Sequence, residues 1–544
     1  MLLKNIYLAA FAAVLFIGFF FRKNGDDSRS KAVDLWFCVT AALIASTFLS
    51  LFPLSREFPY ADSSVFIYIG KMMHKGFLPY KDLFDHKGIL MYFIQYVGLL
   101  IGNGSWIGIW VLEAVNMIVT AWLLFKISRI FTKDKIVRYL SVVAVLVMCG
   151  MQTYEGGNFT EEYALPWISL ALYIFLKYFQ NFTYVTNKEL AGVGLDDMKD
   201  SCSFRDIVWL GAGFAVVSLL RVNMASIWIA VMPVILIRMI FKQQWKKLGS
   251  CALGFICGLA IVYVPVLLYL LITGSLQDFI DCYIIFNFGY SEAGGNWGGV
   301  WSAILKGLAN LPFAVAAFFI SLWPNIKKRL YVLNLWILVV TLYFSHMSGR
   351  FYQHYGMILL PMLVPLFACS LVNLYEIFSL KGKIKLKWKF PGKAIMLTGL
   401  TVVIAGAFFL QFKWSNLIHD SLFQTDGMDV VQEYILANSG EEDDVLIVGN
   451  DVKHYLLAGR STENKYFYQP PPIKISDEVY RGFMDELNRC QSDLIVVMGN
   501  KTECLERDDN LGRVYQYFEE QGQKGKYECE VYENFYAYRR SEGE

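Results

Sequence analysis

Four short polar stretches carry side chains that could do chemistry, and each lies beside a strongly apolar segment. The first contains Asp62, in PYADSSVFIYIGKMM. A carboxylate at this place could accept the proton of a hydroxyl group as a general base. However, an Asp followed by Ser-Ser and an apolar-periodic run is also a common helix start, so capping alone would account for it. The sequence leaves both interpretations open.

The second stretch, GFLPYKDLFDHKGIL, carries charges of both signs in Asp85, His86 and Lys87. A solvated loop would account for the charges. It would not require the aromatic residues that interleave with them, such as Phe84 and Tyr92. The pattern therefore favours a segment that contacts a substrate.

The third stretch, YEGGNFTEEYALP, places Glu161 and Glu162 at the start of a predicted helix. Acidic residues in a first turn complement the positive end of the helix dipole, which is one sufficient role for the pair. Alternatively, either carboxylate could act as a second acid, a metal ligand or an acceptor contact.

The fourth stretch, HMSGRFYQHYGMILLP, contains Arg350, His354 and Tyr355. The guanidinium fork of arginine matches phosphate oxygens, although an arginine at a membrane boundary can also simply reach the lipid headgroups. Arg221, with Asn223 in another predicted hairpin, is a similar candidate. Acids for a hydroxyl nucleophile and cations for a phosphate leaving group suit glycosyl transfer from a lipid phosphate.

The composition indicates that these stretches are held by a membrane protein. Of the 544 residues, 56% are hydrophobic and 18% are charged, below the roughly 25% charged residues of soluble proteins. Apolar runs of about 18 residues or more recur as far as about residue 411. The net charge of +2 gives no reason to expect nucleic acid as a partner, and we predict none.

The positions of Lys and Arg predict the topology, because short cytoplasmic loops are rich in both residues. Placing all the positive clusters inside leaves the four polar stretches, both termini and the C-terminal domain outside. It also requires that the apolar run 88–102 does not cross the membrane. The predicted spanning helices, about twelve, lie at about 5–21, 32–54, 106–126, 137–153, 163–180, 206–222, 224–241, 248–272, 301–323, 330–346, 355–378 and 394–411.

Two domains follow from this topology. Residues 1–411 form an α-helical transmembrane domain, with an outer loop at 55–105, and residues 412–544 form an extracytoplasmic α/β domain. In the latter, MDVVQEYILANSG has helical spacing, while DDVLIVGN, SDLIVVMGN and CEVYENFYAYRR have strand patterns. We expect this domain to be a lid or to dock the acceptor.

The cysteines give no sign of a metal or redox site. The sequence has ten cysteines but no C-x-x-C pair and no Cys/His cluster, so neither structural zinc nor redox chemistry is indicated. Any pairing among Cys490, Cys504 and Cys529 is left open.

Taken in order, the motifs FDHKG, NFTEEYALP and GRFYQHY, followed by a soluble α/β tail, resemble bacterial glycosyltransferases of the GT-C class. The chain is similar over nearly its whole length to the branch of protein O-mannosyltransferases and lipid A aminoarabinose transferases. The resemblance implies juxtamembrane helices at about 62–75 and 89–102. It also implies a multi-pass protein of the bacterial plasma membrane with its active site on the extracytoplasmic face.

The same resemblance implies roles for individual residues. Asp62 matches the catalytic base, and Glu161 matches the second acid, with Glu162 as the alternative. Arg350 matches the residue that holds the donor phosphate, with His354 as a helper. His86 and Lys87 stand where many relatives have H-P-P, so their role is not carried over.

The implied donor is a polyprenyl-phosphate-linked sugar, its lipid tail lying among membrane lipids. The implied acceptor is an envelope glycan, lipid or protein, and transfer would invert the sugar configuration. Some relatives use a divalent metal and others do not, and no ligand spacing in this chain decides between them, so any cofactor stays unknown.

A transporter or flippase is the alternative from a different class. Such a protein would be expected to place ionisable residues near the bilayer midplane and to repeat half of its chain. Here the charged stretches gather on one predicted face, and no repeat is evident in the sequence. The sequence therefore favours the transferase.

Overall fold

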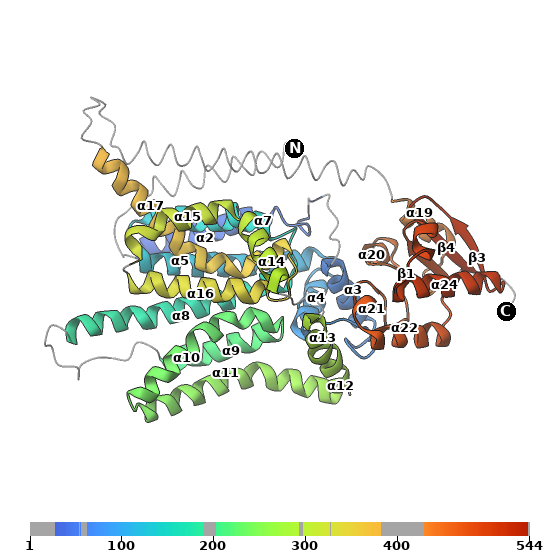
Figure 1. Ribbon diagram of the computed structural model, residues 1–544, viewed down its shortest axis with the longest axis horizontal. Helices are drawn as coiled ribbons and strands as arrows, with labels where there is room; N and C mark the ends of the chain where they lie inside the picture. Colours follow the sequence, from blue (N-terminus) through green and yellow to red (C-terminus); the bar gives the residue numbers. More distant parts are fainter. Residues whose placement is uncertain are drawn as a thin grey trace. The chain divides into compact units, whose positions relative to one another are not determined.

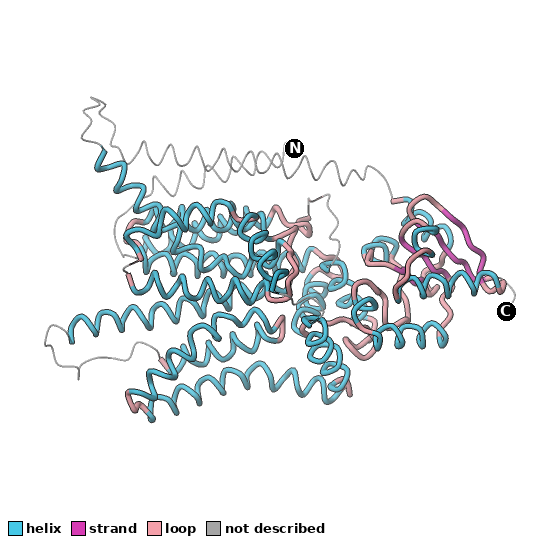
Figure 2. Tube along the Cα trace, in the orientation of Figure 1, coloured by secondary structure: helices cyan, strands magenta, loops and turns pink. Residues whose placement is uncertain are grey.

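The computed structural model describes residues 28–53, 55, 62–189, 203–292, 297–326, 328–381 and 429–541. The described chain is mostly helical, with strands in its C-terminal part (Figure 2). It divides into two compact units. We call the first the helical unit (Met1–Ser55, Trp110–Pro265 and Asn296–Asp420) and the second the mixed unit (Arg56–Ile109, Val266–Gly295 and Ser421–Glu544). The predicted domain boundary at 411 lies outside the described residues.

The helical unit is built from long apolar helices (Figure 1). In chain order its elements are α2 Ser28–Ser46, α5 Ile107–Phe131, α6 Lys135–Val143, η1 Ala144–Cys149, α7 Gly150–Thr153, α8 Thr160–Glu189, α9 Phe204–Ser218, η3 Val222–Ala225, α10 Ser226–Phe241, α11 Trp245–Ile272, α14 Trp297–Ala309, α15 Pro312–Asn325, α16 Arg329–His346, η5 Gln353–Leu359 and α17 Leu360–Lys381. The first turn of α5 and the end of α11 belong to the mixed unit.

The chain is a multi-pass membrane protein. In its described part, five stretches are long and apolar enough to cross a membrane: Ile107–Phe131, Val222–Phe241, Trp245–Ile272, Arg329–His346 and Gln353–Tyr375. The predicted spans at 5–21 and 394–411 lie outside the described residues.

One predicted span is wrong as a single straight helix. The segment 301–323 belongs to two helices, α14 and α15, which meet at an angle of 86°. Pro312 begins the second helix. Its ring removes a backbone donor and clashes with a continuous preceding turn, which explains the break.

The two predicted juxtamembrane helices are present in the mixed unit as α3 (Asp62–His74) and α4 (Ile89–Ile101). With 13 residues, α4 is about 20 Å long, too short for a hydrocarbon core of about 30 Å. The two helices pack closely, because a Cβ on Gly70 would lie 2.6 Å from Cβ of Gln95. Every residue of α3 from Ser63 to Gly70 is buried, so this part of the helix is covered on all sides.

The segment 273–300, which lies between two of the predicted spans, contains α12 (Leu276–Phe279), the π-helix η4 (Ile280–Ile285) and α13 (Phe286–Glu292). These elements also belong to the mixed unit. The three elements are contiguous and form one helical stretch from Leu276 to Glu292, in which the π-helical section shifts the apolar period.

The C-terminal part of the mixed unit has α/β structure, as predicted. Its four-stranded sheet has the order β1-β2-β4-β3, with β1 parallel to β2 and the other pairs antiparallel. The elements are α19 Val430–Asn438, β1 Val445–Val448, α20 Lys453–Ala458, α21 Pro472–Ile475, α22 Asp477–Arg489, β2 Leu494–Met498, α23 Lys501–Leu505, α24 Asn510–Gln523, β3 Tyr527–Val531 and β4 Phe535–Arg540.

The predicted final strand CEVYENFYAYRR is wrong as a single strand, because it forms the hairpin of β3 and β4. The alternation of apolar and polar residues runs through both strands and conceals the turn at Glu533 and Asn534. In β1 and β2, all residues from Val445 to Val448 and from Leu494 to Val497 are buried.

Candidate functional site

Asp85 is the centre of a buried polar network in the mixed unit, in the loop between α3 and α4. It is 1% exposed and accepts three hydrogen bonds. Tyr92 donates its hydroxyl to Oδ2 at 2.7 Å, Tyr468 donates its hydroxyl to Oδ1 at 2.6 Å, and the His86 backbone N–H donates to Oδ1 at 2.7 Å. These donors replace the water that the carboxylate loses on burial.

The network extends from Asp85 to the candidate base. His86 Nδ1 lies 3.3 Å from Asp85 Oδ1, and His86 Nε2 lies 3.3 Å from Lys87 Nζ. The same Lys87 Nζ lies 3.3 Å from Oδ2 of Asp62, whose side chain is 39% exposed. Asp62 is the first residue of α3. The structure therefore brings together four predicted site residues: Asp62, Asp85, His86 and Lys87.

Burial and neighbouring charges determine the protonation of this network. Burial alone would raise the pKa of Asp85. It is outweighed by the hydrogen bond from His86, by the positive charges of Lys87 and of His86 once that is protonated at low pH, and by the hydrogen bond from Tyr468, so the pKa is lowered. Burial, reinforced by Lys87, lowers the pKa of His86, although Asp85 acts in the opposite direction. At neutral pH the network thus contains an Asp85 carboxylate and a neutral His86 imidazole.

Backbone contacts fix the loop that carries these residues. Asn287 donates its side-chain amide to the carbonyl of His86 at 2.7 Å, and Tyr80 donates its hydroxyl to the carbonyl of Lys87 at 2.7 Å. Tyr80 is fully buried with a φ of 69°, an uncommon conformation for a residue with a Cβ. The ring of Phe286 lies 5.3 Å from that of His86.

A second cluster lies in the helical unit, where Glu161 pairs with Arg221. One guanidinium nitrogen donates to Glu161 Oε1 at 2.6 Å, and another donates to the hydroxyl of Tyr355 at 2.7 Å. The guanidinium also lies over the ring of Tyr355, 4.5 Å from its centre. Thr160 donates its hydroxyl to Glu161 Oε2 at 2.8 Å. The structure therefore joins Glu161, Arg221 and Tyr355.

His354 belongs to the same unit and pairs with Glu155. Its Nδ1 lies 2.5 Å from Glu155 Oε2, and its ring stacks on Phe159 with centres 4.4 Å apart. Arg350 lies four residues earlier in the segment that joins α16 to η5, and it is half-buried. The predicted roles of both residues toward a donor phosphate stay predictions.

Glu162 takes different partners from Glu161. Its Oε2 accepts from the Asn158 backbone N–H at 2.9 Å, and the Glu113 carboxyl group lies close to it. Both glutamates are fully buried. Glu162 Oε1 and both carboxyl oxygens of Glu113 have no hydrogen-bond partner among the described residues, so nothing compensates a second negative charge on the pair. Gly157 adjoins the pair, because a Cβ there would lie 2.6 Å from Glu113 Oε1.

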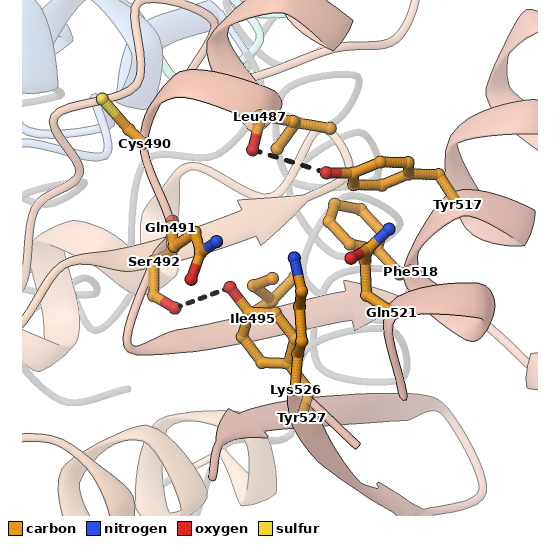
Figure 3. A pocket seen from close by; sticks show the side chains of 10 residues that line it. All are labelled: Leu487, Cys490, Gln491, Ser492, Ile495, Tyr517, Phe518, Gln521, Lys526 and Tyr527. Atoms are coloured by element: carbon orange, nitrogen blue, oxygen red, sulfur yellow. Dashed lines mark hydrogen bonds between the residues drawn. The ribbon is translucent and has the colours of Figure 1, made fainter. Parts of the chain in front are cut away.

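Two cavities in the mixed unit have very different sizes. The one in Figure 3 has about 10 Å³, room for about one water molecule, and is bordered by Tyr517 and Tyr527, whose hydroxyls donate to main-chain carbonyls. It is therefore too small for a substrate. The other has about 510 Å³ and borders on the Asp85 network through Phe84 and Phe286.

The large cavity is rich in carboxylates and aromatic rings. Its polar lining includes Asp278, Asp281, Asp477, Glu478 and Lys465, and Lys465 Nζ pairs with Asp278 at 3.3 Å. Across the described residues, no group of three or more His, Cys, Asp or Glu side chains could hold a metal ion.

Several residues of the two clusters were not predicted from the sequence. They are Glu113, Glu155, Asn158, Asn287 and Tyr468. For Glu113 a signal existed, since an acid inside an apolar helix is rare and commonly functional. For Tyr468, 383 positions from Asp85, the chain offers no local pattern.

Comparison with known proteins gives a family and a fold. The model of the family described as "Putative competence-induced protein Ccs4 N-terminal domain" matches residues 25–398. Among curated proteins, none matches the chain.

Two solved structures have a similar fold over almost the whole chain. ArnT from Cupriavidus metallidurans bound to undecaprenyl phosphate has 12% sequence identity and a TM-score of 0.62, covering 95% of this chain and 99% of that chain. ArnT from the same organism in the apo state has 12% identity and a TM-score of 0.59, covering 94% and 98%. The resemblance predicted from the motifs is thereby confirmed at the level of the fold.

Proposed function

The chain belongs to the family of the Ccs4 N-terminal domain, and we propose that it is a membrane glycosyltransferase with a polyprenyl-phosphate sugar as donor. The ArnT structure that it resembles was solved with undecaprenyl phosphate bound, which supports a donor of this lipid class. The observation that carries the proposal is the partly exposed Asp62 carboxylate held by Lys87 at 3.3 Å.

In the proposed reaction, an acceptor hydroxyl attacks the anomeric carbon of the donor sugar. Asp62 takes the hydroxyl proton as the new carbon–oxygen bond forms. The bond between the anomeric carbon and the phosphate oxygen breaks at the same time, and the polyprenyl phosphate leaves with that electron pair. Attack from the side opposite the phosphate inverts the configuration. Asp62 suits the proton transfer because its carboxylate reaches solvent, whereas Asp85 and His86 are buried and the Lys87 side chain is only 12% exposed.

Arg350 is the proposed partner of the donor phosphate, with His354 as its helper. Arg221 is the weaker candidate, because its guanidinium is already paired with the Glu161 carboxylate at 2.6 Å and its charge is largely compensated. We propose that Arg221 and Tyr355 instead hold Glu161, the proposed second acid. Glu162 supports the turn at Gly157 and Asn158.

The cavity of about 510 Å³ is the proposed acceptor site, because it borders the network that contains Asp62. Its carboxylates can accept hydrogen bonds from hydroxyl groups, and its rings can cover the apolar faces of a sugar. In this proposal the C-terminal domain docks the acceptor, which is one of the two roles expected from the sequence.

Donor binding can be tested with undecaprenyl phosphate and the full-length protein in detergent, by native mass spectrometry. Arg350→Ala is expected to weaken binding by about tenfold, as for the loss of a charge-assisted hydrogen bond. Arg329→Ala, at the opposite end of α16, is the matched control and should bind as the wild type does. Equal binding by the two variants would contradict the role of Arg350.

The transporter alternative is separated by a second assay in proteoliposomes. If the protein is a glycosyltransferase, we expect it to move radiolabel from an undecaprenyl-phosphate sugar to acceptor material. Movement of a solute across the bilayer without any sugar transfer would favour the transporter instead.

A further inference from the structure

The segment Ser461–Tyr468, which follows α20, lies against α3 and the loop after it. The Thr462 backbone N–H donates to the hydroxyl of Tyr68 at 3.1 Å, and the Phe84 backbone N–H donates to the carbonyl of Lys465 at 2.8 Å. Tyr468 then donates its hydroxyl to Asp85. With the bond from Lys75 Nζ to the Ser461 hydroxyl at 3.1 Å, these hydrogen bonds connect the short C-terminal segment to the part of the chain that contains the candidate base.

The contact between these segments is buried and aromatic. Tyr68 is fully buried on α3, and its ring centre lies 4.9 Å from that of Tyr455 and 4.7 Å from that of Phe467. Phe84 packs against Tyr466 with centres 5.3 Å apart. A dry contact of this kind holds its polar members in fixed positions, because side chains in a close-packed interior have few alternative rotamers.

The polar groups form one continuous series that starts at Tyr468. Its hydroxyl lies 2.6 Å from Asp85 Oδ1, which is 3.3 Å from His86 Nδ1. His86 Nε2 is 3.3 Å from Lys87 Nζ, which is 3.3 Å from Asp62 Oδ2. The donors and acceptors select one tautomer of His86: Nδ1–H donates to the Asp85 carboxylate, and Nε2 accepts from the Lys87 ammonium.

We propose that the C-terminal segment Ser461–Tyr468 is a positioning element of the transfer reaction, acting from Tyr468 through Asp85, His86 and Lys87 on the Asp62 carboxylate. The inference rests on the proposed function for its catalytic consequence. Asp85 fixes the imidazole, the imidazole fixes the ammonium, and the ammonium holds Asp62 in one orientation for the acceptor hydroxyl. The C-terminal domain thereby has a second role besides acceptor docking.

The first test measures sugar transfer in proteoliposomes. The donors are a panel of undecaprenyl-phosphate hexoses and pentoses, and the acceptor material is membrane from cells that lack this protein. Tyr468→Phe keeps the ring and removes the hydroxyl, and we expect kcat to fall about tenfold while the donor KM stays within twofold. Tyr538→Phe is the matched control, because it removes a hydrogen bond from a buried tyrosine to Glu519 in the same domain. The control should leave kcat unchanged.

A double-mutant cycle separates positioning from a general structural effect. If Tyr468 acts through Asp85, the change Tyr468→Phe should have no further effect on kcat in an Asp85→Asn background. Additive losses in the double variant would overturn the proposed path.

A third measurement needs neither donor nor acceptor. In full-length protein labelled with 15N-histidine, NMR should show His86 as the neutral Nδ1–H tautomer, with its signal assigned by His86→Gln. Tyr468→Phe should shift that signal, and Tyr538→Phe should not. A Nε2–H tautomer, or a signal unchanged by Tyr468→Phe, would overturn the inference. A wild-type protein that transfers no sugar from the panel, yet shows the expected NMR response, would contradict the proposed function alone.

Discussion

At the scale of single residues, the adjacent Glu161 and Glu162 have opposite electrostatic surroundings. Glu161 forms an ion pair with Arg221, whereas Glu162 lies beside a second buried carboxyl group, that of Glu113. The negative charge of Glu161 is therefore compensated by a cation, whereas a charge on Glu162 would be repelled by a charge on Glu113. Substitution of each by glutamine should have different consequences.

Glu161→Gln should destabilise the protein by about 3 kcal/mol, because it leaves the largely buried charge of Arg221 without its counter-ion. Glu162→Gln should cost less than about 1 kcal/mol, since a neutral amide there cannot repel the neighbouring Glu113 carboxyl group and can donate a hydrogen bond to it. Thermal unfolding of the detergent-solubilised variants measures both. Equal losses would contradict the different pairing of the two glutamates.

Because of the Asp85 network, we expect the folded protein to lose stability as the pH falls. The pKa of His86 is lower in the folded than in the unfolded protein. The contribution of His86 to the free energy of unfolding is therefore complete above the unfolded pKa of about 6.5 and declines as the pH falls below that value. The pKa of Asp85 is also lowered, so its contribution is present above the unfolded pKa of about 4 and is lost at lower pH. Unfolding temperatures between pH 7.5 and 5 should therefore fall less in His86→Gln than in the wild type; parallel curves would count against the buried neutral imidazole.

Sequence reasoning identified the residue types of the site better than their partners. Asp62, Glu161 and Arg221 were all candidates on chemical grounds, because acids and arginines beside apolar segments are unusual. The pairing of Arg221 with Glu161, 60 positions away, depends on the packing of separate helices, which no local period encodes. For the same reason, the sequence could not decide whether Glu161 or Glu162 is the second acid.

At the scale of elements, glycines allow the close approaches that hold the site. Gly157 has a φ of 90°, and a Cβ on it would lie 2.6 Å from Glu113 Oε1 and 3.0 Å from Leu49 Cδ2. Gly104 has a similar φ of 85°, but a Cβ on it would have no atom within 4 Å. The two positions therefore differ in steric contact and share the backbone conformation.

Gly157→Ala should destabilise the protein by about 2 kcal/mol or more, because strain in the backbone adds to a clash with the carboxyl pair. Gly104→Ala should cost only about 1 kcal/mol, the strain alone. The difference in unfolding temperature between the two variants measures the clash. Equal destabilisation would show that Gly157 is needed only for its backbone conformation.

The elements predicted best were the long apolar ones and the strands β1 and β2, whose runs of apolar residues are unambiguous. The errors occurred where one pattern continues across a break. Pro312 divides an apolar run into α14 and α15, and the alternation in β3 continues into β4. A break of this kind is set by packing and turn geometry, which hydropathy does not record.

At the scale of the whole molecule, the described chain is a multi-pass membrane protein whose fold is similar to that of ArnT. The sidedness of its parts stays a prediction from the positive charges. Two exposed positions allow a direct test: Cys529 in β3, predicted outside, and Lys133 in the short turn between α5 and α6, predicted inside.

A membrane-impermeant maleimide should label Cys529 in intact cells, and the label should be lost in Cys529→Ser. In a Cys529→Ser background, Lys133→Cys should be labelled only after the membrane is permeabilised. The reverse pattern would place the C-terminal domain in the cytoplasm and would contradict an extracytoplasmic reaction.

We propose that Asp62 is the general base of a sugar transfer from a polyprenyl-phosphate donor. A comparison of the wild type with Asp62→Asn is the most direct test of this role. Wild type and Asp62→Asn are assayed in proteoliposomes with the donor panel, after both are shown to bind undecaprenyl phosphate equally. We expect the variant to stay folded and to bind the lipid but to transfer sugar at least about 100-fold more slowly. Transfer by Asp62→Asn at the wild-type rate would show that Asp62 is not the general base.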